Sequence, residues 1–408
     1  MIKNPAVPVI MYHSIGIPNR KWQWNYLTCP YEIFESQLKW VKEKAFHTIS
    51  LQRLYDYMKE DVKLLKNPVV LTFDDGYLDN WVFAYPLLKK YGFKGTIYVN
   101  PEFTDPRNII RKNLEDVWKG EAKIDKLETI GYLSWKEMKE MEDEGVMDIQ
   151  SHTLSHTWYP TSNRIIDFRH PRDPYIWMTW NDNPAKKPYL QIDNEELVNY
   201  GEPVCEYGRA TGTRRYFPDE ILKEFMKNYV EERSGKDFFD SKNWRDELFE
   251  VARKYKEENW LNERYETEEE YEERVYYELK KSKEIIEHKL DKEAKFLCWP
   301  GGAVTDKALK MASDIGYVSS TAGRDMKYER KYLRNKYEED PSRINRRGSA
   351  LYWDGIEGFG SKVKYMNGFY FALSLYNFQG RKIVAPISRL ILATAFIRYK
   401  IITSLTYD

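Results

Sequence analysis

The stretch Val69–Asp75 places the strongest constraint on how this chain folds. Apolar and β-branched residues run directly into two adjacent carboxylates, Asp74 and Asp75, and Gly76 follows at once. A short run of this kind, ended by a turn residue, predicts a buried strand with both acids at its C-terminal end. Because successive strand side chains point to opposite faces, the two acids need not share one task. From this stretch alone, a solvated Asp-Asp-Gly turn remains an equal alternative.

Apolar runs alternate with helical patterns through the first 157 residues and again after residue 283. The sequence predicts strands at 7–12, 69–75, 95–99, 147–150, 296–299 and 317–320, with helices at 34–44, 51–58, 82–91, 134–145 and 305–315. This alternation predicts βα units around a parallel sheet or barrel, in which functional side chains gather at the C-terminal ends of strands. We therefore expect convergence of the side chains that follow predicted strands, namely His13, Asp74, Asp75, His152 and His156.

The βα rhythm breaks after residue 157. Residues 158–218 are rich in Pro, Trp, Tyr, Asn and Arg without a clear period, and residues 218–290 are charged and helical in pattern. We therefore divide the chain into a discontinuous barrel (1–157 and 283–349), a largely helical, aromatic-rich insertion (158–282) and a C-terminal tail (350–408). The aromatic residues of the insertion either line a glycan groove or pack its helices, and packing is the simpler expectation.

Charge and cysteine content exclude several classes of protein. The 64 basic residues balance the 64 acidic residues, so no global field favours nucleic acid. The three cysteines, Cys29, Cys205 and Cys298, are far apart and predict neither a disulfide framework nor a thiolate cluster. The N-terminus enters a strand-like run without a long apolar leader, so we expect a cytoplasmic protein.

The C-terminal tail has its own character. Residues 383–405 are apolar but interrupted by Arg389, Arg398 and Lys400, and the longest uncharged run is too short to span a bilayer. A basic, apolar helix of this kind either packs on its own domain or a second subunit, or lies on an anionic membrane surface. We favour packing and keep peripheral contact with the inner membrane as the alternative.

A histidine pair supplies the second half of a candidate metal site. His152 and His156 are four residues apart and follow a predicted strand. With one aspartate they offer two nitrogens and one oxygen, a plausible open zinc site with a position left for water. Such an ion lowers the pKa of its water to about 7, and a second carboxylate can then take the proton. The adjacent pair Asp74 and Asp75 fits this division of labour.

These residues carry a family resemblance. Thr72–Tyr77, together with His152–His156, closely resembles the polysaccharide deacetylase family, carbohydrate esterase family 4. Residues 8–15 are similar to the opening strand of the branch that acts on poly-N-acetylglucosamine. Further matches follow in the family's order at 133–135, 148–152, 296–302, 316–324 and 343–346. The resemblance covers about 1–157 and 283–348.

The resemblance implies a fold, a reaction and a set of roles. The fold is a distorted (β/α) barrel with fewer than eight regular strands, and the reaction is metal-dependent removal of an acetyl group from a sugar. Asp74 would be the general base, and a backbone N–H near Trp299 would help stabilise the oxyanion. Tyr12 and His13 would lie beside the pocket. The implied ligands of a divalent metal, usually zinc, are Asp75, His152 and His156.

Two departures from the family matter. Many members have an arginine in the strand that here reads Cys298–Pro300, and many have a late histidine as general acid, whereas this chain has neither. We therefore expect Arg324 or Arg346 to assist Asp74. His13 is our candidate for the acid or orienting role.

The leading interpretation is a deacetylase acting on an N-acetylated glycan or glycoconjugate. A nucleotide- or lipid-linked precursor suits both the expected cytoplasmic location and the basic, apolar tail. The alternatives are a catalytically silent carbohydrate-binding scaffold and a metal-dependent amidase for a small non-sugar substrate. The sequence specifies neither the sugar nor its linkage, the metal or the oligomeric state.

Overall fold

The computed structural model describes residues 5–19, 21–22, 24–60, 62–190, 195–323, 333–348, 363–380 and 382–405. One nine-stranded sheet, parallel at every pairing, forms its centre. In spatial order the strands are β14 (Arg343–Ile344), β13 (Ser319–Thr321), β12 (Phe296–Leu297), β7 (Met147–Ser151), β6 (Gly95–Val99), β5 (Pro68–Asp75), β1 (Val9–Tyr12) and β15 (Arg347–Gly348), with β4 (His47–Thr48) beside β5.

The two edge strands, β14 and β15, are consecutive in the chain. Only Asn345 and Arg346 separate them, so the chain steps from one edge of the sheet to the other. The buried side-chain amide of Asn335 donates both to the Val7 carbonyl and to the Asn345 carbonyl, each at 2.9 Å. This amide therefore bridges the place where the two edges of the sheet approach each other. The sheet is a nearly closed, distorted (β/α) barrel, as expected.

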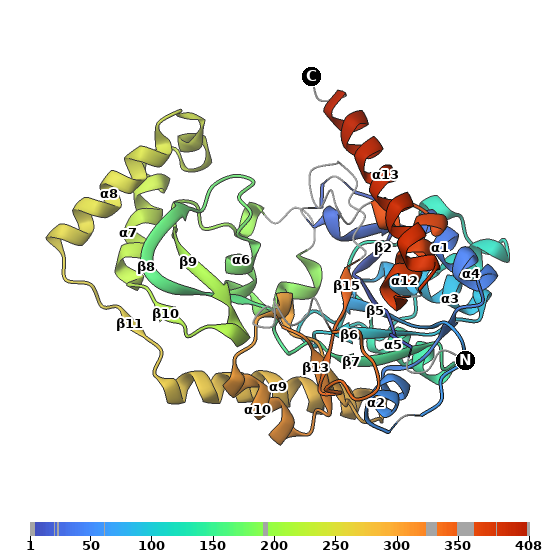
Figure 1. Cartoon of the computed structure of the whole chain (residues 1–408). Coiled ribbons are helices and arrows are strands. Elements are labelled where there is room, and N and C mark those ends of the chain that lie inside the picture. The colour runs from blue at the N-terminus through green and yellow to red at the C-terminus, as the bar shows by residue number, and fades with distance from the viewer. Residues whose placement is uncertain are drawn as a thin grey trace.

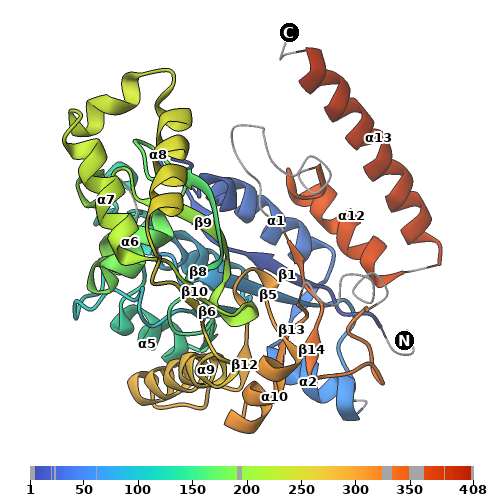
Figure 2. The ribbon, with the colours of Figure 1, turned by 90° about the vertical axis from the view of Figure 1, so that its left-hand side faces the viewer.

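Helices cover the outside of the barrel (Figures 1 and 2). They are α1 (Tyr31–Glu43), α2 (Leu51–Glu60), α3 (Tyr85–Tyr91), α5 (Trp135–Asp143), α9 (Glu268–Leu290) and α10 (Asp306–Ile315), with the short α4 (Leu114–Trp118) and the strand pair β2 (Ser14–Gly16) and β3 (Thr28–Pro30) in connecting segments. The expected helix boundaries hold where the caps are specific. Gly92 ends α3 in the left-handed conformation with φ +71°, and Ser134 with Glu137 forms a capping box on α5.

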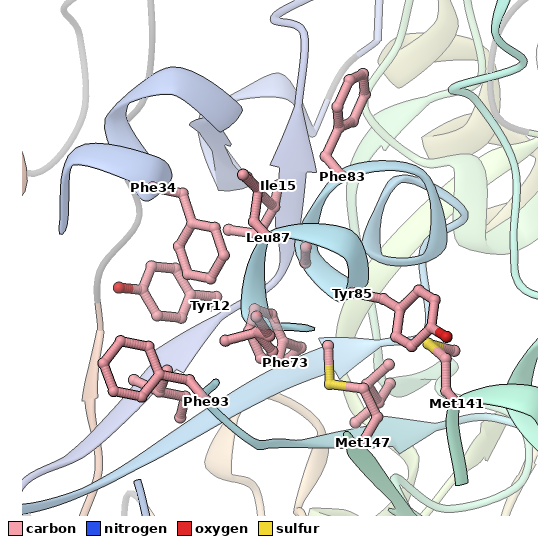
Figure 3. Packing of buried hydrophobic residues seen from close by; sticks show 14 of the residues in the cluster. Tyr12, Ile15, Phe34, Phe73, Phe83, Tyr85, Leu87, Phe93, Met141 and Met147 are labelled. Atoms are coloured by element: carbon pink, nitrogen blue, oxygen red, sulfur yellow. The ribbon is translucent and has the colours of Figure 1, made fainter. Parts of the chain in front are cut away.

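The largest buried cluster lies between the sheet and the helices α1, α3 and α5 (Figure 3). Every residue of β5 is buried, which explains its nearly continuous apolar sequence. The Phe73 ring stacks on Tyr12 at 5.4 Å between centroids and meets Phe34 edge-on at 5.9 Å. The strand that carries the two acids is therefore fixed along its whole length.

The insertion combines helices with strands. It contains β8 (Trp158–Phe168), α6 (Ile176–Asp182), β9 (Pro203–Arg209), β10 (Tyr216–Phe217), α7 (Glu220–Glu231), α8 (Trp244–Glu258) and β11 (Arg264–Tyr265). Strands β8 and β9 pair as an irregular antiparallel ladder, which the aperiodic sequence did not indicate. The boundary expected after residue 282 falls inside α9, which packs on α10 and β7 of the barrel.

The tail forms two helices, α12 (Gly368–Gln379) and α13 (Val384–Leu405). Helix α12 contacts α1 of the barrel on one side and α13 on the other, and α13 lies on the outside of the molecule (Figures 1 and 2). Among the described residues, no helix combines the length and apolarity that crossing a bilayer requires.

Candidate active site

The three expected metal ligands meet at the C-terminal ends of β5 and β7. His152 Nε2 lies 3.3 Å from Asp75 Oδ1, and His156 Nε2 lies 3.4 Å from the same oxygen. Asp75 ends β5 in the left-handed region with φ +72°, and His156 has φ +44° in the loop after β7. The local backbone therefore turns both side chains toward one point.

The donor atoms of these groups fit a divalent cation. His152 Nδ1 lies 2.8 Å from the Cys298 carbonyl, and donation to that oxygen orients Nε2 toward Asp75. Burial lowers the pKa of His152, but Cys298, Asp75 and Asp74 outweigh burial and raise this pKa well above its ordinary value. Burial lowers the pKa of His156 to about 4, so this ring is neutral at neutral pH despite the nearby carboxylate of Asp75. Asp75 Oδ1 is buried and makes no hydrogen bond within the described part of the chain. Two imidazole nitrogens around an unpaired carboxylate oxygen are a typical zinc donor set.

The loop that carries the histidines is held from outside. The carboxylate of Glu278 on α9 accepts hydrogen bonds from the Ser155 hydroxyl at 2.6 Å and the Ser155 N–H at 3.0 Å. Lys187 of the insertion donates to the Ser155 carbonyl at 3.1 Å, and Asn100 donates to the Thr153 carbonyl at 3.2 Å. These contacts stabilise a loop in which Thr153, at φ +63°, also has a left-handed backbone.

Asp74 faces an arginine on the other side of β5. Arg346 Nη1 donates to Asp74 Oδ1 at 2.6 Å, and Nη2 donates to Oδ2 at 2.8 Å. Burial alone would raise the pKa of Asp74, but Arg346, with smaller contributions from His152 and His13, lowers it below the ordinary value. Asp74 is therefore an ionised, oriented carboxylate next to the histidine pair.

Arg346 is one of the two arginines that the sequence offered for this role, and Arg324 lies outside the described residues. Arg346 comes from the two-residue step between β14 and β15. Its Nη2 lies 2.9 Å from the Cys298 sulfur, which itself is 3.5 Å from Asp74 Oδ2. Cys298 was not expected in the site. The sequence did contain one signal for Cys298. This residue occupies the strand position at which many members of the resembled family have an arginine.

His13 and Tyr12 point in different directions because they are neighbours at the end of a strand. His13 lines the pocket, with Nε2 3.9 Å from Asp74 Oδ2 and a buried Nδ1 that has no partner among the described residues. Tyr12 does not reach the pocket, contrary to expectation. It packs in the core, where its hydroxyl donates to Gln37 at 2.6 Å (Figure 3).

Trp299 lines the pocket, and its own backbone N–H is not free. Its backbone N–H donates to the Thr321 hydroxyl at 3.2 Å. Its indole Nε1 is buried without a hydrogen-bond partner in the described chain. The unpaired donor at this position is therefore the indole N–H.

One cavity of about 290 Å³ is lined by both acids, three histidines, the arginine and the tryptophan of this site: Asp74, Asp75, His13, His152, His156, Arg346 and Trp299. Its wall is aromatic and is shared between the barrel, which supplies Trp24, and the insertion, which supplies Trp158 and Trp180. The Trp24 ring lies nearly parallel to those of Trp158 and Trp180, with centroids 6.2 and 6.4 Å away. Arg209, at the end of β9, also lines the cavity. Composition indicated surplus aromatic residues in the insertion, but not which of them reach the site.

The sequence of this chain is similar to the sequences of known proteins. The sequence model of the family described as polysaccharide deacetylase matches residues 61–170 and 258–320. The Bacillus subtilis protein YxkH, whose name places it in the same family, is 33% identical over 154 residues, which are 38% of this chain and 44% of that protein. A poly-beta-1,6-N-acetyl-D-glucosamine N-deacetylase of Staphylococcus aureus is 30% identical over 122 residues, 29% of this chain and 35% of that protein. This chain thus spans less than half the length of the curated relatives it matches.

Among solved structures, a de-N-acetylase from Aggregatibacter actinomycetemcomitans has the same fold. The superposition has a TM-score of 0.51 at 18% identity and covers 88% of this chain and 99% of that one. The two aspartates and the two histidines all lie within the first matched segment of the family. Residues 61–170 and 258–320 of this chain are therefore similar to the polysaccharide deacetylase family.

Proposed function

We propose that this chain is a metal-dependent hydrolase that removes the acetyl group from an N-acetylated sugar. One observation carries the proposal: an ionised carboxylate, Asp74, and a three-residue metal donor set share the floor of a single cavity. A glycan-binding scaffold needs neither a proton acceptor nor an unpaired carboxylate oxygen facing two imidazoles. Both features are what hydrolysis of an amide requires.

The residues around the cavity have separate tasks in this proposal. A divalent ion bound by Asp75, His152 and His156, with zinc the first candidate, would activate water and polarise the acetyl carbonyl. Asp74 accepts the proton of the attacking water, and the two hydrogen bonds from Arg346 keep it ionised and oriented. His13, 3.9 Å from Asp74, is placed to return a proton to the leaving amine.

The oxyanion needs a donor on the opposite side of the acetyl group. We assign this role to the indole N–H of Trp299, because it is buried, lines the cavity and has no partner among the described residues. A donor without a competing acceptor is already prepared for charge that develops during the reaction.

The aromatic wall supports a sugar as substrate. Trp24 and Trp180 present indole N–H groups without partners in the described part of the chain, beside flat ring faces. Flat rings stack on the apolar faces of pyranoses, and the N–H groups can donate to hydroxyls. The substrates to test are polysaccharide oligomers and lipid- or nucleotide-linked acetamido sugars.

The decisive experiment measures acetate release from each substrate class, with and without chelator. The variant Asp74→Asn is expected to lose activity by a factor of about 10² to 10⁴ while its metal content stays unchanged. Asp125→Asn, which makes the same change at an exposed position outside the cavity, serves as the matched control. Full activity of Asp74→Asn, or release that no chelator reduces, would contradict the proposal.

Two other outcomes identify the alternatives. Glycan binding without turnover in the metal-loaded protein indicates a silent carbohydrate-binding scaffold. Acetate release confined to small non-sugar amides indicates an amidase of a different substrate class.

A further inference from the structure

Helix α13 carries an apolar surface that nothing in the described structure covers. Four residues on one side of the helix, and one residue immediately before it, are between 54% and 78% exposed: Ile387, Leu390, Ile397 and Ile401, with Ile383 before the helix. Their spacing of four, three, seven and four residues places them within one narrow stripe along an α-helix. We call these five residues the outer stripe.

The outer stripe is not the face by which α13 packs on the protein. The packed face contains Ala385, Ser388 and Leu392, all buried, and it contacts α12 and the turn at Val363–Tyr365. At 100° per residue, these residues lie on the side of the helix opposite the stripe. Folding of the chain therefore leaves the stripe facing outward, on the outside of the molecule (Figures 1 and 2).

Positive charge flanks the outer stripe. Lys382, Arg389 and Lys400 lie along one side of it and Arg398 along the other. Between residues 362 and 407 the sequence has seven lysines and arginines and neither aspartate nor glutamate, although the whole chain is neutral. Residues 362–407 are thus a basic region on a chain whose remaining part is acidic.

The positive charge continues at the base of α13. Arg334, Arg347 and Arg389 line a cavity of about 300 Å³, and no acidic residue is among its lining residues. A partner of this region must therefore combine an apolar layer, which covers the isoleucines, with negative charge at the level of the flanking cations. A bilayer containing anionic phospholipid has both properties.

We propose that α13 docks this protein on an anionic phospholipid surface, with the outer stripe in the boundary layer of the acyl chains and the flanking cations at the headgroups. This inference does not depend on the deacetylase activity. Each flanking Lys or Arg contributes about a fivefold increase in affinity for an anionic surface, and the contribution falls with salt.

The test is flotation of the full-length chain with vesicles. We expect binding to mixed phosphatidylglycerol–phosphatidylcholine vesicles and much weaker binding to pure phosphatidylcholine. The double variant Leu390→Glu with Ile397→Glu is expected to lose binding at least tenfold, because it places two carboxylates in the outer stripe. Ile221→Glu on α7, a residue 68% exposed, is the matched control and should bind as the unmodified chain does.

A second pair of measurements separates lipid from other occupants. The variant Arg398→Gln with Lys400→Gln should reduce anionic-vesicle binding about 25-fold, and its far-ultraviolet circular dichroism should match that of the unmodified chain. Equal binding to neutral and anionic vesicles, or no binding at all, would overturn the proposal. It would also be overturned by a dimer, seen by sedimentation without vesicles, that the double glutamate variant dissociates, since the stripe would then be an interface between copies.

Discussion

At the scale of single residues, the proposed function of this site depends on the different partners of two buried carboxylates. Asp74 and Asp75 are adjacent, yet one is paired with a guanidinium and the other faces two imidazoles. The strand geometry separates them, because neighbouring side chains leave a strand on opposite sides. A buried carboxylate without a guanidinium or imidazole partner behaves differently. Asp79, four residues after Asp75, is such a carboxylate.

The pairing with Arg346 predicts a pH effect. Burial opposes ionisation of Asp74, and Arg346 is the largest group that favours it, so Arg346→Gln should raise the pKa of Asp74. We expect the acidic limb of kcat/KM to move upward by about 1 to 3 pH units, with lower activity at neutral pH. Arg346→Lys keeps the charge but loses the two-point contact, and should shift the limb less. An unchanged limb in Arg346→Gln would show that Asp74 does not titrate in that range.

Asp79 predicts a pH dependence of stability. Burial raises its pKa to about 7, although the Ser14 hydroxyl and the backbone N–H groups of Ile15 and Asn80 act in the opposite direction. The folded state therefore keeps this proton up to about pH 7, whereas the unfolded chain releases it near pH 4. The stabilisation is fully present below about pH 4 and is lost as the pH rises to about 7, a change of at most roughly 4 kcal/mol.

The variant Asp79→Asn isolates this effect because an amide stays neutral. In urea unfolding of the metal-free protein, we expect the variant to be more stable than the unmodified chain at pH 8, and the difference to vanish near pH 4. Asp125→Asn, at an exposed site, should show no such crossover. A constant difference at all pH values would mean that Asp79 is ionised in the folded state.

At the scale of elements, α9 links the insertion to the candidate metal site. This helix begins beside β11 of the insertion, and its Glu278 side chain binds the Ser155 hydroxyl and N–H in the loop of the two histidines. Such outer contacts fix the direction in which a ligand points, although they do not touch the metal.

Glu278→Gln should therefore weaken metal binding. The amide keeps the shape but provides one acceptor oxygen in place of two, so the loop loses one of its two ties to α9. We expect a roughly tenfold loss of metal affinity, measured by competition with a chromogenic chelator, and near-normal kcat at saturating metal. Glu273→Gln, an exposed change on the same helix, is the control. Equal affinities in the two variants would remove Glu278 from this role.

Several elements of this fold follow from local patterns in the sequence, whereas contacts between distant segments do not. The sequence predicted β5, the capped helices α3 and α5, and the meeting of His13, both aspartates and both histidines, because each depends on a local pattern and on one rule about strand ends. It did not decide between Arg324 and Arg346, since Arg346 reaches Asp74 across 272 positions of the sequence. The ladder of β8 and β9 was hidden because irregular pairing leaves no period of two in the residues. Tyr12 was misplaced because a resemblance indicates which segment lies near a pocket but not which way a side chain points.

At the scale of the whole molecule, the cavity is a joint product of the barrel and the insertion. The barrel provides the acids and histidines, and the insertion provides Trp158, Trp180 and Arg209. In the proposed function, the aromatic wall, to which both parts contribute, contacts the substrate, and the acids and histidines of the barrel carry out the reaction.

This division predicts an effect on substrate binding alone. Trp180→Phe and Trp24→Phe each remove an indole N–H and reduce the flat surface while keeping an aromatic ring in the wall. We expect KM for glycan oligomers to rise about 3- to 10-fold with kcat nearly unchanged. Trp260→Phe is the matched control, because Trp260 belongs to the insertion but is 87% exposed and lies outside the cavity. A fall in kcat without a change in KM would place these rings in the chemical step instead.

The position of the strands that close the barrel has a consequence for synthesis of this chain on the ribosome. Arg346, which keeps Asp74 ionised and oriented, lies between the two strands that close the barrel. It is therefore the last of the proposed catalytic and ligand residues to be synthesised. A nascent chain that already contains Asp75 and both histidines can assemble the ligand set but still lacks the partner of its base. If the chain has the proposed hydrolase activity, a product that ends before Arg346 lacks the partner that orients Asp74 and is expected to be inactive.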